Sequence, residues 1–344
     1  MKTIDLEAHF ATEEYIAYLR SGKTFPKLET VEGEKQQKFD RVWYEPNVCQ
    51  SRTVATSHQL LDLGDGRLSE MDAAGIDMQV ISLIDPGCDL FDLPEAIAIA
   101  RKANDDLSQV IKKHPDRFIG LATLALQDPS EAADELERAV NELGLRGAKM
   151  HSNTGGEYLD DQKYWTVFER AEKLGVPIYL HPMVPSVSMR RPYVSYGWAL
   201  AGASLGFGAE TALHVMRLIC SGVFDKYPKL KIILGHLGEA LPFWLHRIDS
   251  GWLRPLSPGE LGPKCKKKPS EYLKTNFIVT TSGMFFEPAF LCVYMALGAD
   301  NISFAVDYPY ADNRSAVQFI RAVPICDNDK QKICHLNAEK LFRA

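Results

Sequence analysis

The stretch "TIDLEAHF", residues 3–10, joins an apolar strand pattern to two side chains that can bind a metal. Its alternating apolar residues are typical of a buried strand. Glu7 and His9 stand two positions apart, and on an extended chain that spacing directs both side chains the same way. The pattern leaves two alternatives: a pair of metal ligands at the end of a strand, or an ordinary polar strand end.

Seven further short apolar runs follow along the chain. Together with the first they predict eight strands, at residues 3–10, 78–84, 117–124, 146–152, 176–182, 231–238, 277–283 and 302–309. Amphipathic stretches with glycine, proline or polar residues at their ends predict helices between and after them, at 66–75, 93–115, 128–144, 162–175, 316–324 and 329–342. This alternation predicts an α/β fold, a (β/α)8 TIM barrel forming a single domain over residues 1–344. An open doubly wound sheet is the alternative.

Three stretches are too long to be simple connections: residues 11–65, 183–210 and 250–275. We expect them to be long loops after strands 1, 5 and 6, where such loops build the pocket of a barrel. The first is expected to form a lid or a contact between subunits.

The composition limits the class of partner. The 344 residues are 46% hydrophobic and 24% charged, and the net charge of −6 argues against nucleic acid or an anionic membrane as the main partner. No apolar run reaches the roughly 18 residues of a membrane span, and the first residues lack a signal-peptide pattern. Seven cysteines without a CxxC pair fit reduced thiols. We therefore expect a cytoplasmic protein that binds a small molecule.

The ends of three predicted strands carry metal-binding residue types. Glu7 and His9 end the first strand, His181 the fifth and Asp307 the eighth. In a closed parallel barrel all these ends meet at one pocket. Two imidazoles and two carboxylates suit zinc or manganese. Each of these residues alone could have a structural role. A separate structural role would then be needed at every one of these strand ends, so the pattern favours one shared divalent cation.

The motif "GHLGE", residues 235–239, places Glu239 three residues after His236. A carboxylate beside an imidazole orients the ring and favours its protonated form. We expect a catalytic dyad beside the metal, with Glu239 in the first turn of the next helix. A structural polar pair is the alternative.

These motifs resemble one family. The "ExH" of residues 7–9, "LHP" of 180–182, "GHLGE" and "DYP" of 307–309 resemble the amidohydrolase-related metal-dependent decarboxylases. This group includes the aminocarboxymuconate semialdehyde, γ-resorcylate and 5-carboxyvanillate decarboxylases. The stretches "EMDAAGID", "HPDRFIGLATLALQDP" and "NAEKLF" also resemble the group, and the chain as a whole most resembles the 5-carboxyvanillate decarboxylases.

The resemblance implies a (β/α)8 fold, one divalent metal and nonoxidative cleavage of a carbon–carbon bond. It assigns the metal ligands to Glu7, His9, His181 and Asp307, although some members lack the histidine of the first motif. Hydrolytic relatives usually carry HxH on the first strand and often a carboxylated lysine on the fourth. Here Glu7 takes the first position, and the neighbours of Lys149 do not require that role.

Two arginines also fit the decarboxylase pattern. Arg52 lies in the first long stretch, and Arg247 follows the sixth strand. A guanidinium fork suits a carboxylate substrate. In related decarboxylases an arginine at the second position reaches the pocket of a neighbouring subunit. The motif "WLHRID" around Arg247 and the long loops predict a homodimer or homotetramer. Surface salt bridges are the alternative.

The resulting hypothesis is decarboxylation of an ortho-hydroxybenzoate, such as 5-carboxyvanillate or a dihydroxybenzoate. The ring carbon is protonated first and carbon dioxide then leaves, with Asp307 as proton donor and His236 and Glu239 setting the protonation state. One alternative is a metal-dependent hydrolase or hydratase of an aromatic-degradation intermediate, because a fold does not define a reaction. A noncatalytic metal-binding barrel is the other.

Overall fold

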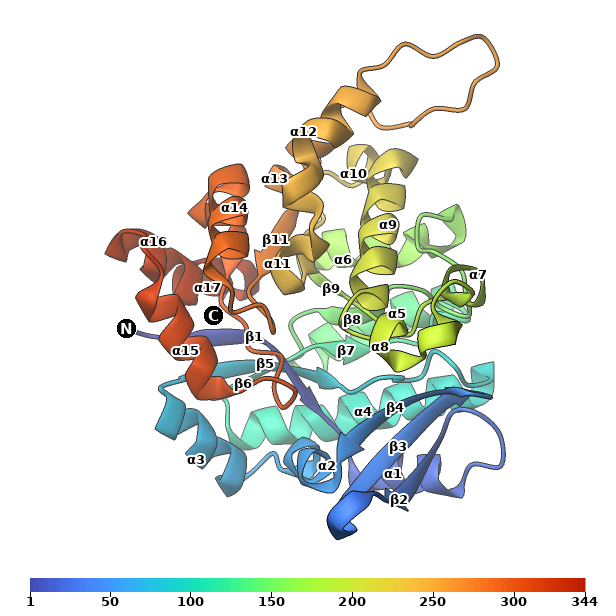
Figure 1. Cartoon of the computed structure of the whole chain (residues 1–344), viewed down its shortest axis with the longest axis vertical. Helices are drawn as coiled ribbons and strands as arrows, with labels where there is room; N and C mark the ends of the chain where they lie inside the picture. The colour runs from blue at the N-terminus through green and yellow to red at the C-terminus, as the bar shows by residue number, and fades with distance from the viewer. Residues whose placement is uncertain (344) are drawn as a thin grey trace.

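The computed structural model describes residues 1–343. Eight parallel strand positions surround a central axis, and helices cover them on the outside (Figure 1). In chain order these positions are β1 (Ile4–Phe10), β5 (Met78–Leu83), β6 with β7 (Phe118–Gly120 and Ala122–Thr123), β8 (Ala148–His151), β9 (Ile178–His181), β10 (Ile232–Leu234), β11 (Phe277–Thr280) and β12 (Ile302–Ser303). Each of the eight predicted strands is present.

Backbone hydrogen bonds close the sheet into a barrel. Between the segment after β12 and β1, Ala8 forms a parallel bridge with Tyr308, and the Leu6 N–H donates to the Phe304 carbonyl at 3.1 Å. At the other junction, Leu121 stands between β6 and β7 in one continuous strand. Its N–H donates to the Ile81 carbonyl of β5 at 3.0 Å, and the Ala122 N–H of β7 donates to the Gly147 carbonyl just before β8 at 2.8 Å. The prediction of a (β/α)8 barrel is therefore confirmed, and the open sheet is excluded.

The helices begin and end close to where the sequence predicts. The predicted ones are α3 (Asp65–Ala74), α4 (Leu93–Lys113), α5 (Pro129–Asn141), α6 (Trp165–Leu174), α15 (Asn313–Ala322), α16 (Asp327–Gln331) and α17 (Asn337–Phe342). The structure also contains helices for which no bounds were predicted: α9 (Gly206–Ser221), α10 (Val223–Lys226), α11 (His236–Glu239), α12 (Leu241–Trp252) and α14 (Glu287–Leu297). Gly75 and Gly175 end α3 and α6 in the left-handed conformation that glycine adopts without steric cost.

The first long stretch is an ordered subdomain rather than an irregular loop. It contains α1 (Glu13–Ser21), an antiparallel sheet of β2 (Lys27–Glu32), β3 (Lys38–Glu45) and β4 (Val48–Thr53), and α2 (Val54–Leu61). This small sheet lies beside the barrel (Figure 1). Along β3 more buried and less buried residues alternate, as expected for a sheet that packs on one face.

The other two long stretches differ from each other. Residues 183–210 contain α7 (Val187–Arg190), α8 (Trp198–Ala201) and the start of α9, and they follow β9 as expected. Residues 250–275 begin in the last turn of α12 and end in α13 (Pro269–Thr275). They are therefore a helix-to-strand connection and not the expected loop after strand 6. The Lys264 N–H donates to the Cys220 carbonyl at the end of α9, which places this segment away from the carboxyl ends of the strands.

Candidate metal centre

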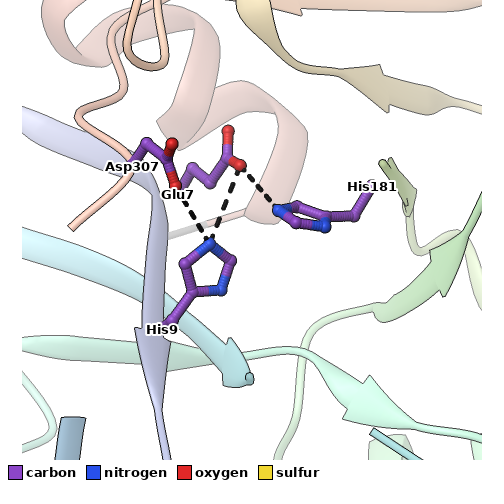
Figure 2. A group of neighbouring side chains, drawn as sticks. All are labelled: Glu7, His9, His181 and Asp307. Carbon is purple, nitrogen blue, oxygen red and sulfur yellow. Dashed lines mark hydrogen bonds and ion pairs between the residues drawn. The ribbon is translucent and has the colours of Figure 1, made fainter. Parts of the chain in front are cut away.

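The four residues predicted as metal ligands meet at the carboxyl end of the barrel. Glu7 Oε1 lies 3.0 Å from His181 Nε2 and 3.8 Å from His9 Nε2, and His9 Nε2 lies 3.2 Å from Asp307 Oδ1 (Figure 2). One ligand atom from each residue lies within 4.8 Å of all the others. A bulge in β1 between Asp5 and Ala8 precedes His9, and bulges often redirect side chains near active sites.

The donor atoms fit a divalent cation. Glu7 Oε1 is buried and has no hydrogen-bond partner among residues 1–343, although Tyr179 donates to the other carboxylate oxygen. Burial opposes ionisation of Glu7, but the imidazoles of His236 and His181 outweigh it and lower its pKa. Burial lowers the pKa of His9 and so favours the neutral ring that a metal requires. The set of two imidazoles and two carboxylates matches zinc or manganese.

The ring of His181 has a defined orientation. Its Nδ1–H donates to the Pro182 carbonyl at 2.7 Å, so the lone pair of Nε2 points toward Glu7. Such a hydrogen bond on the far side of the ring is the usual way to hold the tautomer of a ligating histidine.

His236 and Glu239 form the expected pair beside this group. His236 Nδ1 lies 2.8 Å from Glu239 Oε1, and His236 Nε2 lies 3.9 Å from both Asp307 Oδ2 and Glu7 Oε1. Burial alone would lower the pKa of His236, but the carboxylates of Glu239 and Glu7 raise it well above 6.5. The ring is therefore held as an imidazolium next to Asp307.

The backbone that carries this pair differs from the expectation of an ordinary helix start. Residues 236–240 all have positive φ: His236 52°, Leu237 53°, Gly238 76°, Glu239 52° and Ala240 62°. They form a left-handed turn before α12, although a left-handed conformation costs a non-glycine residue about 1–2 kcal/mol. Asp307 also has a positive φ, of 75°. Such strain is concentrated at functional sites, where the surrounding structure maintains it.

The two predicted arginines have different surroundings. Arg52, in β4, is buried, and its Nε donates to Ser57 at 3.0 Å and its Nη1 to the Tyr310 hydroxyl at 3.4 Å. Its Nη2 is buried without a partner among the described residues. Arg247 is exposed on α12 and makes no ion pair within residues 1–343. Arg52 is thus beside the site, whereas Arg247 lies on the outer surface of this chain.

A second group of charges next to the site was not expected. Asp85 Oδ1 accepts from Lys149 at 2.9 Å and from His151 Nε2 at 2.5 Å, and His151 Nδ1 lies 2.7 Å from Asp89. Asp85 Oδ2 lies 3.5 Å from His181 Nδ1. We call Asp85, Asp89, Lys149 and His151 the buried tetrad.

The protonation of the buried tetrad follows from its geometry. Both ring nitrogens of His151 face carboxylates, which only accept hydrogen bonds, so both nitrogens carry protons. Burial opposes this charge, but Asp89 and Asp85 raise the pKa of His151 to about 9. The Lys149 ammonium is paired with Asp85 at 2.9 Å, which does not fit the role of a carboxylated metal bridge. The motif "KMH" at the end of the fourth strand could have indicated this group, by the same strand-end reasoning that found His181.

Asp5, which was not predicted as a site residue, lies on the same strand as Glu7. Its Oδ1 accepts from the N–H groups of Glu7 at 3.0 Å and Val306 at 2.8 Å. It therefore ties together the two strand ends that carry Glu7 and Asp307. Burial raises the pKa of Asp5 to about 8.

Comparison with known proteins identifies the family. The amidohydrolase family model matches residues 4–344, and the chain belongs to this family. It is 41% identical over 297 residues to the gamma-resorcylate decarboxylase of Rhizobium sp. strain MTP-10005, covering 83% of this chain and 89% of that relative.

Solved structures agree with this assignment. The dihydroxybenzoic acid decarboxylase of Polaromonas sp. JS666, with bound manganese and 2-nitroresorcinol, is 37% identical with a TM-score of 0.84, covering 99% of this chain and 97% of that one. The 5-carboxyvanillate decarboxylase of Sphingomonas paucimobilis is 37% identical with a TM-score of 0.86, covering 99% of each chain. The predicted family of metal-dependent decarboxylases is therefore confirmed, and manganese in a neighbour agrees with the predicted divalent cation.

Proposed function

We propose that this chain is a metal-dependent nonoxidative decarboxylase of an ortho-hydroxybenzoate, with Glu7, His9, His181 and Asp307 as ligands of one Zn²⁺ or Mn²⁺. The observation that carries the proposal is the meeting of these four ligand atoms within 4.8 Å, in a barrel whose relatives are decarboxylases of hydroxylated aromatic acids. When bound, the cation supplies Lewis-acid polarisation of substrate oxygens.

The chain's own residues supply the proton. Direct loss of carbon dioxide would leave an unstable aryl carbanion, so the ring carbon has to be protonated first. Asp307 Oδ1 faces His9, which leaves Oδ2 to carry a proton toward the ring. His236 Nε2, 3.9 Å from that oxygen, restores the proton, and Glu239 keeps His236 charged. The three residues form a short proton path that ends at the substrate carbon.

Arg52 is proposed to hold a carboxylate of the substrate. Its unpartnered Nη2 is a buried donor, and a buried unsatisfied donor costs about 1–3 kcal/mol unless a ligand accepts from it. Tyr310, which accepts from Nη1, has its ring centre 6.1 Å from that of the proposed ligand His9, so Arg52 lies close to the metal centre. A substrate carboxylate would complete the guanidinium fork.

We further propose that the protein is a homo-oligomer that places Arg247 against a neighbouring copy. Phe243 is 76% and Trp244 47% exposed on α12, and Phe286, just before α14, is 61% exposed. Arg247 stands one helical turn after Phe243 and so shares its face. Exposed large apolar side chains on the helix that carries an exposed arginine are typical of an interface between subunits. Sedimentation velocity tests this assignment, with Phe243→Ser and Trp244→Ser expected to yield monomers.

The proposal extends to the cellular location and the domain organisation of the chain. No helix among residues 1–343 is long and apolar enough to cross a membrane. We propose a cytoplasmic location, with the barrel and the small sheet forming one domain over residues 1–344.

The test of the function is carbon dioxide release by the metal-loaded protein from a panel of ortho-hydroxybenzoates that includes 2,6-dihydroxybenzoate and 5-carboxyvanillate. In deuterium oxide, one deuteron is expected at the vacated ring carbon. Asp307→Asn should retain some metal and lose nearly all turnover, whereas Asp92→Asn, at an exposed position, should not change it. Near-parental turnover by Asp307→Asn would refute its role as proton donor. Incorporation of water into the product without carbon dioxide would favour a hydrolase or hydratase instead.

A further inference from the structure

A second concave site lies at the end of the barrel away from the metal centre. It is a pocket of about 900 Å³ lined by residues that directly precede β9, β10, β11 and β12, and by α17. The metal-centre residues His181, His236 and Asp307 lie at or after the carboxyl ends of strands in the same part of the sheet. We call this second site the basic pocket. It shares no residue with the metal centre, so it calls for a separate explanation.

The lining of the basic pocket is strongly cationic. Six cationic side chains and two carboxylates line it. One of the carboxylates, Asp300, is paired with Lys332 at 2.9 Å, and one of the cations, Lys173, is paired with Glu169 at 2.5 Å. The other five cations have no carboxylate partner within residues 1–343: Lys229, Lys231, Lys274, Lys340 and Arg343. Only Glu172 opposes them, in a chain whose overall charge is −6.

Lys231 is the least solvated member of this group. It is half-buried, and its Nζ donates to the Thr275 carbonyl rather than to an anion. Burial and the charge of Lys340 lower the pKa of Lys231. Keeping the Lys231 side chain protonated at this position therefore costs free energy. Like charges gathered in a concave site focus a positive potential, and a bound anion offsets the cost of gathering them.

We propose that the basic pocket binds a small, multiply charged phosphate anion, such as a di- or triphosphate group. Lysine ammonium groups bind phosphate as point charges, and four of the five unpaired cations are lysines. The concave shape suits a small anion better than an extended nucleic acid strand. Because the pocket contacts the starts of four strands, the bound anion also stabilises the half of the barrel that carries His181, His236 and Asp307.

Tripolyphosphate is the probe for the test, titrated calorimetrically into the metal-loaded protein at low ionic strength. The variant Lys274→Glu/Lys340→Glu changes two exposed positions in the pocket. The matched control Lys23→Glu/Lys112→Glu changes the net charge equally at two exposed positions outside it. We expect the pocket variant to bind at least about tenfold more weakly than the parent, and the control to bind within about twofold of it. Lys231→Met, which removes a charge without adding one, should give an intermediate loss.

The same set of proteins distinguishes binding in the basic pocket from removal of the active-site metal by tripolyphosphate. Chelation depends on the metal centre and would be equal in the parent and both double variants, so metal content is measured after each titration. The proposal is overturned if the parent shows no saturable binding at millimolar tripolyphosphate, or if both double variants lose binding equally. Tighter binding of a short RNA than of tripolyphosphate would also overturn it, in favour of a nucleic acid site.

Discussion

His236 Nδ1 lies 2.8 Å from Glu239 Oε1 across a turn in which both residues have φ of 52°. A right-handed helix also brings residues three apart together, but there the pair would occupy a helix surface. Here the left-handed turn precedes α12 and holds the imidazole 3.9 Å from Asp307. The local strain is therefore linked to the placement of a charged ring beside the proposed proton donor.

Replacing Glu239 by Gln is expected to move the pH profile of turnover. Glu239 helps to raise the pKa of His236 well above 6.5, so its loss lowers that pKa and His236 gives up its proton at lower pH. The alkaline limb of kcat/KM should then shift toward lower pH, with about 10²–10⁴-fold lower activity at its optimum. Glu260→Gln, in the exposed segment after α12, is the control. An unmoved alkaline limb in Glu239→Gln would contradict the role of this pair.

The left-handed turn also makes a prediction about stability. Ala240 is exposed with φ of 62°, so Ala240→Gly should increase the free energy of unfolding by about 0.5–1 kcal/mol. Ala98→Gly, at an exposed position inside α4, should instead decrease it by about 1 kcal/mol. Urea unfolding at neutral pH measures both changes. A loss of stability in both variants would show that this turn is not strained.

Arg52→Lys is expected to weaken substrate binding more than it slows chemistry. Lysine keeps the charge but cannot present the two parallel donors of a guanidinium, so KM should rise about tenfold or more while kcat falls less. Arg41→Lys, on the adjacent strand β3, is the matched control. Steady-state kinetics with the best substrate of the panel measure the effect. Unchanged KM in Arg52→Lys would remove Arg52 from the substrate site.

The buried tetrad predicts a positioning role for Asp85. Asp85 lies 3.5 Å from His181 and neutralises Lys149 and His151, so Asp85→Asn should weaken metal binding about 10–100-fold. Competition with a chelator measures the metal Kd independently of turnover. Asp65→Asn, at an exposed position in α3, is the control. The double variant Asp85→Asn/Lys149→Met restores the charge balance and should recover stability without recovering metal affinity. Parental metal affinity in Asp85→Asn would show that the tetrad is only structural.

The buried, neutral ring of His214 is expected to make the free energy of unfolding decrease in acid. Its Nε2 accepts from the Leu159 N–H at 2.9 Å and its Nδ1–H donates to the Ser152 carbonyl at 2.7 Å, so the folded chain requires the neutral ring. Burial lowers the pKa of His214 to about 3, from an ordinary value of 6.5. The unfolded chain therefore binds this proton first, and the stabilisation present above pH 6.5 is lost as pH falls toward 3.

Between pH 6.5 and about 3, protonation of His214 lowers the free energy of unfolding by about 1.4 kcal/mol for each pH unit. Urea unfolding at pH 7 and pH 5 should show a larger decrease for the parent than for His214→Gln, whose amide can replace part of the hydrogen bonding without titrating. Equal decreases in the two proteins would assign the acid sensitivity to other groups.

Much of the fold, the four proposed ligands and the pairing of His236 with Glu239 were predictable from the sequence. The runs of apolar residues locate all eight strands, and the residues at helix ends locate most of the helices between them. Both signals lie within a few residues of the element that they predict. Closure of a parallel barrel then brings strand ends together, so Glu7, His181 and Asp307 could be placed in one pocket although they are up to 300 positions apart. The glutamate of "TIDLEAHF" and the other motifs were enough to indicate the decarboxylase family, which the relatives confirm.

Other features depended on tertiary structure alone. Four features cannot be read from the sequence pattern alone. They are the small sheet that buries Arg52, the left-handed turn around His236, the pairing of Lys149 with Asp85, and the basic pocket that Lys231 lines. Each depends on which atoms of distant segments come within a few ångströms, and that distance decides whether a charge is paired, buried or free. The sequence by itself therefore determined the barrel and the residues at its strand ends, whereas only the three-dimensional packing decided their partners and protonation.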